Sequence, residues 1–430
     1  MRSDKFEEFL SKVISKVKSK EAQGLIRNEL RNHLQALKQA CQQKTFSKED
    51  AEKKAIEEMG NPFTLGEDLN LLHRPKIDWV LIALFGMIAV ISFLPLVNGA
   101  NGLSNPFVRQ TIWYTLASLI LITLLFFDYR KLKKLWMLFY GIGLIIHVYT
   151  YFFGITINGA KCWVDLPGVV LYVPMITVFF FILSWAGIFN RINAITSKSK
   201  QGVISLLFWI PLLVYLLLPD FTIGFIYFTC ITTMFVFSPV RKKIAIKLVA
   251  FNTIVTLSVV IIIISFFWRR VYNRVSLILN YSANGEMDIY HKVRETLSQA
   301  GWFGNGINSK LQVPNAHTDL VFPYLVNLFG WVFGILLCLI LLVFMIRILL
   351  NGLKSKDSFG RLLVIGGGTL LIVPTILNIA MGLGLIPYIS VSLPFISYGG
   401  SMLIVSTAML GLILSIYRRK DIVEGTKVKK

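Results

Sequence analysis

The stretch GWFGNGINSKLQVPNAHTDLVF, residues Gly301–Phe322, interrupts a chain that is otherwise dominated by long apolar runs. Its closely spaced glycines lead to Pro314. His317, Thr318 and Asp319 follow and stand directly before the next apolar run. A carboxylate at such a boundary loses part of its hydration, which is unfavourable unless a partner or a function compensates. Asp319 is therefore the first candidate functional residue.

The composition around this stretch is typical of a membrane protein. Of the 430 residues, 55% are hydrophobic and 16% are charged, and apolar runs near twenty residues long recur from Trp79 onward. The net charge of +21 comes largely from basic residues in short loops between these runs, where such residues act as orientation signals and contact anionic head groups. This placement argues against a nucleic-acid partner. The sequence predicts an all-α, polytopic protein in contact with membrane lipids.

Ten hydrophobic segments are expected to cross the bilayer. Pro219 and Asp220 form a turn between the fifth and the sixth, because proline removes a backbone donor and is unfavourable inside a helix. The expected segments are approximately residues 79–97, 112–127, 135–153, 169–189, 203–218, 221–237, 248–268, 322–345, 362–381 and 401–417.

Residues 1–75 differ from this pattern and predict a small helical domain. Apolar residues recur there at helical spacing and indicate three or four short amphipathic helices. Ser47 is the expected N-cap of one helix, with Asp50 three residues later, and Gly60–Pro62 is expected to end it. The segment Ile26–Asn70 resembles the permease-prefix (HAAS-type) domains that precede bacterial permeases, which implies a cytoplasmic regulatory or interaction module. A membrane domain over 76–420 and a basic tail over 421–430 would follow.

Basic residues are concentrated in alternate loops, which the positive-inside rule places in the cytoplasm together with both termini. The long loop 269–321 then faces outward, and no His or Cys spacing typical of a metal site is visible. Cations near a carboxylate at this surface suit an anionic, phosphate-bearing lipid. The outward loops contain six carboxylates: Asp165, Asp220, Glu286, Asp288, Glu295 and Asp319.

Each of these residues also has an ordinary explanation. Arg269 and Arg270 directly follow a span, where basic side chains commonly extend to the head groups. The loop carboxylates other than Asp319 fit solvated charges, local ion pairs or a turn. His317 could make a local hydrogen bond, and Trp163 could be an interfacial aromatic. Asp319 stands out only because an apolar run follows it.

Three blocks of the sequence resemble the FtsW/RodA/SpoVE (SEDS) family. Residues 301–322 resemble its signature of spaced glycines, a proline and His-Thr-Asp. Asn378–Ser401, NIAMGLGLIPYISVSLPFISYGGS, resembles its carboxy-terminal motif, with Ser392 where the family has a proline. Gly159–Gly168, GAKCWVDLPG, is similar to the family's GARRWIxLG. The chain is identified as a member over about residues 79–420.

The resemblance implies the ten-helix SEDS fold and a peptidoglycan glycosyltransferase that polymerises lipid II at the outer face of the bacterial cytoplasmic membrane. It also implies a class B penicillin-binding protein as partner. In this comparison Asp319 is the catalytic base for the 4-hydroxyl of the acceptor sugar, which attacks the anomeric carbon of the growing glycan with inversion. No cofactor is assigned, and a requirement for a divalent cation stays open, as does a role in elongation, division or sporulation.

Substrate binding is assigned to residues of the matching motifs and to nearby cations, which could stabilise the departing undecaprenyl pyrophosphate. The candidates are Lys161, Trp163, Arg274, Lys292, Arg294, His317, Thr318, Asn378, Pro394, Ser397, Tyr398, Gly399, Gly400 and Ser401.

Departures from the family pattern keep two alternatives open. Asn327 and Leu328 stand where the family has a pair of glutamates, and the run from Tyr172 to Met175 keeps only the proline of the family's QPSE. These changes are consistent with a catalytically weak or inactive scaffold for a penicillin-binding protein. A flippase for the lipid-linked precursor is the other alternative, since Gly366–Gly368 and Pro374 could break the ninth span.

Overall fold

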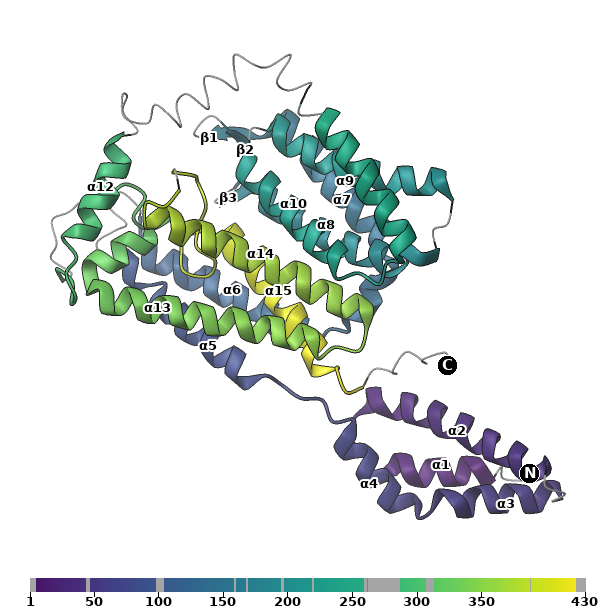
Figure 1. Ribbon diagram of the computed structural model, residues 1–430. Helices are drawn as coiled ribbons and strands as arrows, with labels where there is room; N and C mark the ends of the chain where they lie inside the picture. Colours follow the sequence, from purple (N-terminus) through teal and green to yellow (C-terminus); the bar gives the residue numbers. More distant parts are fainter. Residues whose placement is uncertain are drawn as a thin grey trace. The chain divides into compact units, whose positions relative to one another are not determined.

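The computed structural model describes residues 5–43, 47–97, 104–157, 160–167, 169–194, 197–218, 220–258, 261, 287–306, 313–386 and 388–422. The chain divides into two compact units (Figure 1). One unit comprises Met1–Asp78 together with Tyr417–Lys430, and the other comprises Trp79–Ile416.

The first unit contains four amphipathic helices, as the spacing of apolar residues predicts: α1 (Lys5–Ser15), α2 (Lys20–Gln43), α3 (Lys48–Met59) and α4 (Pro62–Leu72). Leu10, Val13 and Leu34 are fully buried in its core. The predicted cap of α3 is confirmed, since the Ser47 side chain accepts a hydrogen bond from the Asp50 amide at 3.2 Å. Gly60 ends α3 with a φ of 76°, which glycine adopts without a steric penalty.

The last described residues, up to Ile422, belong to the core of this first unit. Ile422 is 1% exposed and lies in the same apolar cluster as the helices. Arg419 is equally buried and donates to both carboxylate oxygens of Glu21, at 2.8 and 2.9 Å. A buried guanidinium requires such a partner, because an unpaired charge in the interior is strongly destabilising. The His73 ring contacts the Asp421 carbonyl at 2.7 Å.

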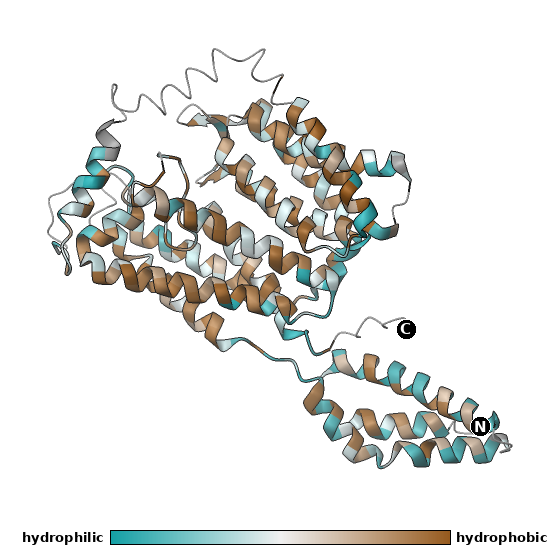
Figure 2. Ribbon diagram, in the orientation of Figure 1, coloured by the Kyte–Doolittle hydropathy of each residue, from teal (hydrophilic) through white to brown (hydrophobic). Residues whose placement is uncertain are grey.

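The second unit contains a helix in each of the ten predicted segments, and the chain is a multi-pass membrane protein. In the described ranges eight helices are long and apolar enough to cross a membrane, α10 is shorter, and residues 242–258 are also helical. Most of their residues are apolar, whereas the helices of the first unit have a mixture of apolar and polar residues (Figure 2). The labelled helices are α5 (Trp79–Ile91), α6 (Pro106–Phe126), α7 (Trp136–Phe153), α8 (Val173–Asn190), α9 (Lys198–Leu217), α10 (Phe221–Val236), α12 (Met287–Ser298), α13 (Val321–Leu353), α14 (Ser358–Gly382) and α15 (Gly400–Arg418). Three short 3-10 helices accompany them: η1 (Leu94–Leu96), η2 (Tyr129–Lys134) and η3 (Ile192–Ala194).

A small sheet replaces one predicted loop and the start of one predicted span. β1 (Ile155–Ile157), β2 (Ala160–Leu166) and β3 (Val169–Tyr172) pair antiparallel in that order. The prediction that the fourth span begins at residue 169 is therefore wrong, because 169–172 form a strand and α8 begins at Val173. An apolar run this short fits a strand or a helix equally well, and here the pairing with β2 decides.

The glycines of α14 serve close helix packing. A Cβ atom at Gly366 would lie 2.5 Å from Sδ of Met234, and one at Gly367 would lie 2.4 Å from Sδ of Met409. Small residues at such contacts let membrane helices approach closely. The expectation that these glycines and Pro374 could break the ninth span is wrong, since α14 is helical from Ser358 to Gly382.

Helix α13 is interrupted at Gly330, which has φ 85° and ψ 174°. The amides of Trp331 and Val332, which the interruption exposes, donate to the carbonyls of Gly301 and Trp302 at 3.1 and 3.2 Å. In return, the amides of residues 305 and 306 donate to the carbonyls of residues 327 and 328. The glycine-rich stretch thus satisfies backbone groups at the break and fixes the part of α13 that follows Asp319.

Candidate active site

Asp319 lies in a tight turn directly before α13. The amides of Thr318 and Leu320 both donate to the carbonyl of Asn315, at 3.0 and 3.1 Å. Asn315 has a φ of 51°, a left-handed conformation that asparagine tolerates better than most residues. The Asp319 side chain is 8% exposed. The apolar residues that follow it, from Val321 to Leu328, are buried within the protein, so Asp319 borders on a protein interior.

The Asp319 carboxylate accepts hydrogen bonds from three hydroxyl groups. Tyr388 Oη and Ser390 Oγ donate to Oδ2 at 3.0 and 2.9 Å, and Ser392 Oγ lies 3.5 Å from Oδ1. All three come from the segment that follows α14. Asp319 does not cap α13, whose N-cap residue is Leu320 and has no side-chain cap.

Burial raises the pKa of the Asp319 carboxyl, because the charged form loses hydration. The hydroxyls of Ser390, Tyr388 and Ser392 oppose this effect by donating to the charged form, and the nearby His317 also lowers the pKa. A carboxylate with a raised pKa in a partly desolvated site is a competent proton acceptor.

The backbone of Asp319 is held by Asn378 from α14. The side-chain amide of Asn378 donates to the backbone carbonyl of Asp319 and to that of Val391, at 2.7 Å each. Asn378 is fully buried. One side chain therefore links the turn that presents the carboxylate to the segment that supplies the hydroxyls.

The SYGGS block, Ser397–Ser401, holds the two residues before Asp319 by hydrogen bonds to their backbone carbonyls. The Tyr398 amide donates to the carbonyl of His317 at 2.7 Å, and the two rings are packed edge to face. The Ser397 hydroxyl donates to the carbonyl of Thr318 at 2.6 Å and accepts from the Leu393 amide at 2.8 Å. The two family motifs are therefore joined through consecutive backbone carbonyls. A direct substrate contact by these residues stays a prediction.

The remaining residues of the block shape the start of α15. Pro394 is buried, and Gly399 follows Tyr398 with a φ of 153°. A Cβ atom at Gly400 would lie 2.3 Å from the Trp113 ring, so only glycine allows this approach. The Ser401 hydroxyl accepts a hydrogen bond from the Tyr172 amide at 2.9 Å.

Two of the predicted substrate contacts lie on the sheet. Lys161 donates to the Phe152 carbonyl at the end of α7, at 3.1 Å. Trp163 packs on the Tyr172 ring with 4.8 Å between centroids. Both residues have a structural role here, and their assignment to substrate binding stays a prediction.

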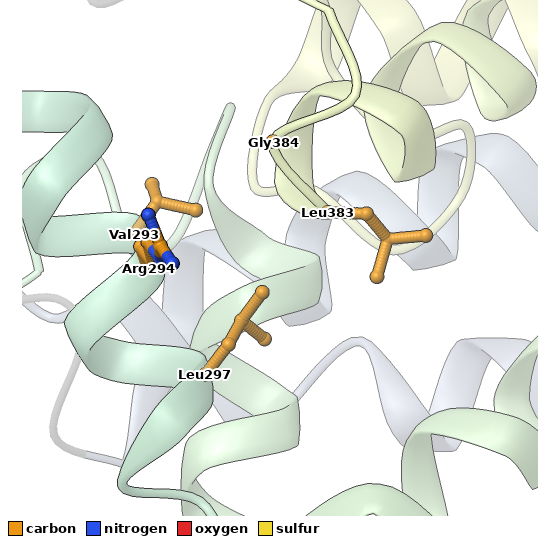
Figure 3. Close-up of a pocket in the computed structure, with 5 residues that line it drawn as sticks. All are labelled: Val293, Arg294, Leu297, Leu383 and Gly384. Carbon is orange, nitrogen blue, oxygen red and sulfur yellow. The ribbon is translucent and has the colours of Figure 1, made fainter.

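The predicted cations of the long loop are divided between the described residues and the rest. Arg274 lies outside the described residues, whereas Lys292 and Arg294 are on α12. Arg294 lines a cavity of about 140 Å³ together with Val293, Leu297, Leu383 and Gly384 (Figure 3). Val293 also packs in the apolar cluster that contains Leu320, the residue after Asp319. The assignment of Arg294 and Lys292 to substrate binding stays a prediction.

The two positions where the family has glutamates serve packing. The Asn327 amide donates to the Thr296 carbonyl at 2.8 Å and is buried, which ties α13 to α12. Leu328 is buried in the apolar cluster around Val293 and Leu320. In this chain, hydroxyl donors to Asp319 come from residues 388–392.

Sequence reasoning missed Tyr388, Ser390 and Asn315. The first two alternate with Ser392 along the chain, and in an extended segment alternate side chains point to the same side. That alternation could have shown that the three hydroxyls share one side of the segment, but it does not reveal that they face Asp319. Among the described residues, no cluster of three or more His, Cys, Asp or Glu side chains could hold a metal ion.

Comparison with known proteins agrees with these motifs. The family model for FtsW/RodA/SpoVE cell cycle proteins matches residues 73–422. The chain belongs to this family. It is similar to a probable peptidoglycan glycosyltransferase FtsW of Enterococcus hirae, with 24% identity over 80% of this chain and 93% of the relative. It is also similar to the peptidoglycan glycosyltransferase MrdB of Escherichia coli K12, with 30% identity over 65% of this chain and 77% of the relative.

Solved structures confirm the SEDS fold of the membrane unit. A chain from a study of polymerization and crosslinking by a peptidoglycan synthase complex aligns with a TM-score of 0.66, covering 80% of this chain and 98% of that chain at 22% identity. The rod shape determining protein RodA of Thermus thermophilus aligns with a TM-score of 0.60, covering 80% and 97% at 22% identity.

Proposed function

We propose that this SEDS protein is a peptidoglycan glycosyltransferase that polymerises lipid II, with Asp319 as its general base. The observation that carries the proposal is the buried Asp319 carboxylate, which does not cap α13 and, in the described part of the chain, accepts hydrogen bonds from hydroxyl groups. Family membership supports it, as do the names of the relatives in Enterococcus hirae and Escherichia coli.

The reaction is a single displacement with inversion. Asp319 removes the proton from the 4-hydroxyl of the acceptor sugar, and that oxygen attacks the anomeric carbon of the growing glycan. The bond to undecaprenyl pyrophosphate breaks, and the pyrophosphate leaves as an anion that a nearby cation such as Arg294 stabilises in this proposal. Positioned base catalysis contributes about 10²–10⁴-fold, and holding both lipid-linked substrates in one membrane adds a proximity effect.

The proposal places Asp319 at the outer face of the bacterial cytoplasmic membrane and both termini in the cytoplasm. The alternating basic loops support this orientation. A class B penicillin-binding protein is the proposed partner, because a transpeptidase would crosslink the strands that this protein makes.

The decisive experiment is incubation of the purified protein with lipid II, followed by gel analysis of glycan strands. Wild type should form strands and Asp319→Ala should not. Ser298→Ala, which removes an exposed hydroxyl bonded to the Glu295 carbonyl of α12, is the matched control and should polymerise normally. Polymerisation by Asp319→Ala would remove Asp319 from the mechanism.

The same material tests the alternatives. Transfer of labelled lipid II across liposomes that is unchanged in Asp319→Ala, without strand formation, would favour a flippase. Co-purification with a penicillin-binding protein, with no strands formed by the pair, would favour a scaffold.

A further inference from the structure

We propose that Tyr388 and Ser390 are positioning residues that hold Oδ2 of Asp319, so that Oδ1 is the oxygen that accepts the substrate proton. Ser392 is the weak partner of Oδ1 that the substrate hydroxyl replaces. This inference rests on the proposed function, because it concerns the base of that reaction.

The distances divide the two carboxylate oxygens. Oδ2 accepts two hydrogen bonds of ordinary length, 2.9 Å from Ser390 and 3.0 Å from Tyr388. Among the described residues, the partner of Oδ1 is the Ser392 hydroxyl, at 3.5 Å, which is the outer limit of such a bond. A substrate hydroxyl that reaches Oδ1 therefore displaces one weak contact, whereas Oδ2 would have to lose two good ones.

The direction of the Tyr388 hydroxyl is set by a second bond. The side-chain amide of Asn315 donates to the Tyr388 hydroxyl oxygen at 3.2 Å. An amide nitrogen only donates, so the phenolic proton is left for Asp319. Asn315 is also the residue whose carbonyl closes the turn around Asp319, so the turn itself orients the tyrosine.

The segment that supplies these hydroxyls departs from the family motif. Ser392 stands where the family motif has a proline, and residues 388 and 390 fall between the two blocks of the motif. The two family glutamates after His-Thr-Asp are absent, and Asn327 and Leu328 are used for packing. Hydroxyls from residues 388–392 thus supply the polar surroundings of the base.

The hydroxyls also stabilise the ionised form of the base, which burial disfavours. The other groups that act on the carboxyl are limited in the described part of the chain: His317 lowers its pKa, and Tyr388 is itself a donor. Loss of a donor should therefore raise the pKa of Asp319, so that a higher pH is needed to ionise it.

The experiment compares the pH dependence of lipid II polymerisation in wild type, Tyr388→Phe and Ser390→Ala. The acidic limb of the kcat/KM profile should move to higher pH by about one unit in each variant. At a pH on this limb, kcat/KM should fall about tenfold, and at higher pH it should return to the wild-type value. Ser390→Thr retains the donor and should behave as wild type. Ser298→Ala, which removes a hydroxyl bonded to the Glu295 carbonyl within α12, should leave the limb in place.

A second measurement does not depend on activity. Carbodiimides modify protonated carboxyl groups, so labelling of Asp319 against pH, followed by mass spectrometry, reports its ionisation directly. The midpoint should move to higher pH in Tyr388→Phe and Ser390→Ala. Unchanged midpoints, or a rate loss that is equal at every pH, would overturn the inference. If wild type makes no strands but the midpoints move, the proposed function fails while the assignment of the hydroxyls stands.

Discussion

Asp220 and Asp319 occupy similar places in the sequence and have different surroundings in the structure. Each stands just before an apolar helix, α10 or α13, on the side predicted to face outward. Burial raises the pKa of both carboxyls. Neither burial nor the apolar run that follows therefore distinguishes the two.

The hydrogen-bond partners do distinguish them. The Asp220 carboxylate caps α10 by accepting from the Ile223 amide at 3.1 Å, and it also accepts from the Tyr172 hydroxyl. A helix N-terminus needs such an acceptor, so this carboxylate is used by the fold. Asp319 does not cap α13, and its partners among the described residues are hydroxyl groups, of which the weak one, Ser392, can be replaced by a substrate hydroxyl. The comparison teaches that the donor type, rather than burial, marks a carboxylate that is available for chemistry.

The largest expected effect separates the two residues by activity. Asp319→Asn keeps the size of the side chain but removes the base, so the polymerisation rate should fall about 10²–10⁴-fold. Asp220→Asn retains a good N-cap and should stay within about threefold of wild type, since asparagine caps helices as well as aspartate does. Initial rates of strand formation from lipid II measure both. Equal losses in the two variants would break the comparison.

The next effect separates them by stability. Asp220→Ala removes the cap of α10 and the partner of the Tyr172 hydroxyl, and should lower the free energy of unfolding by about 2 kcal/mol. Thermal unfolding in detergent, followed by tryptophan fluorescence, would show this change. Asp220→Asn is the control and should unfold near wild type. A wild-type melting temperature for Asp220→Ala would mean that the cap contributes nothing.

A smaller effect concerns the pH dependence of stability. Because the folded pKa of Asp319 is raised, its stabilising contribution is present at low pH and is lost as the pH rises through the folded pKa. Asp319→Asn stays neutral, so at neutral pH it should be more stable than wild type by about 0.5–2 kcal/mol while being inactive. Melting curves across pH would test this. A variant that is less stable than wild type at neutral pH would contradict the sign.

The smallest effect concerns the link between the two regions. Ser401, at the start of α15, accepts from the amide of Tyr172, whose hydroxyl donates to Asp220. Ser401→Ala should destabilise the protein by about 1 kcal/mol, because the Tyr172 amide loses its acceptor. A double-mutant cycle with Asp220→Asn would measure the coupling. Ser401→Thr keeps the hydroxyl and should unfold near wild type. If Ser401→Thr is as unstable as Ser401→Ala, the loss comes from packing rather than from the hydrogen bond.

Much of the fold could be predicted from the sequence. The apolar segments, the amphipathic helices of residues 5–72 and the Ser47 cap all depend on local patterns. The helices over 5–72 and the cap are confirmed, and in the described ranges eight helices are long and apolar enough to cross a membrane. The start of β3 could not be predicted, because a short apolar run fits a strand or a helix and the pairing with β2 decides. The role of the α14 glycines could not be predicted either, because Gly366 and Gly367 pack against Met234 and Met409, which lie on other parts of the chain.

By itself, the sequence determined that this is a polytopic SEDS protein and that Asp319 lies in its His-Thr-Asp motif. The polytopic class rests on composition and periodicity, and the family rests on the resemblance of sequence motifs; all of these are properties of the linear chain. Only the tertiary structure decided what surrounds the carboxylate. The hydroxyls of Tyr388, Ser390 and Ser392 lie about 70 residues away and reach Asp319 because Asn378 and the SYGGS block hold the two segments together. The availability of a buried charge depends on such long-range donors, which no local pattern encodes.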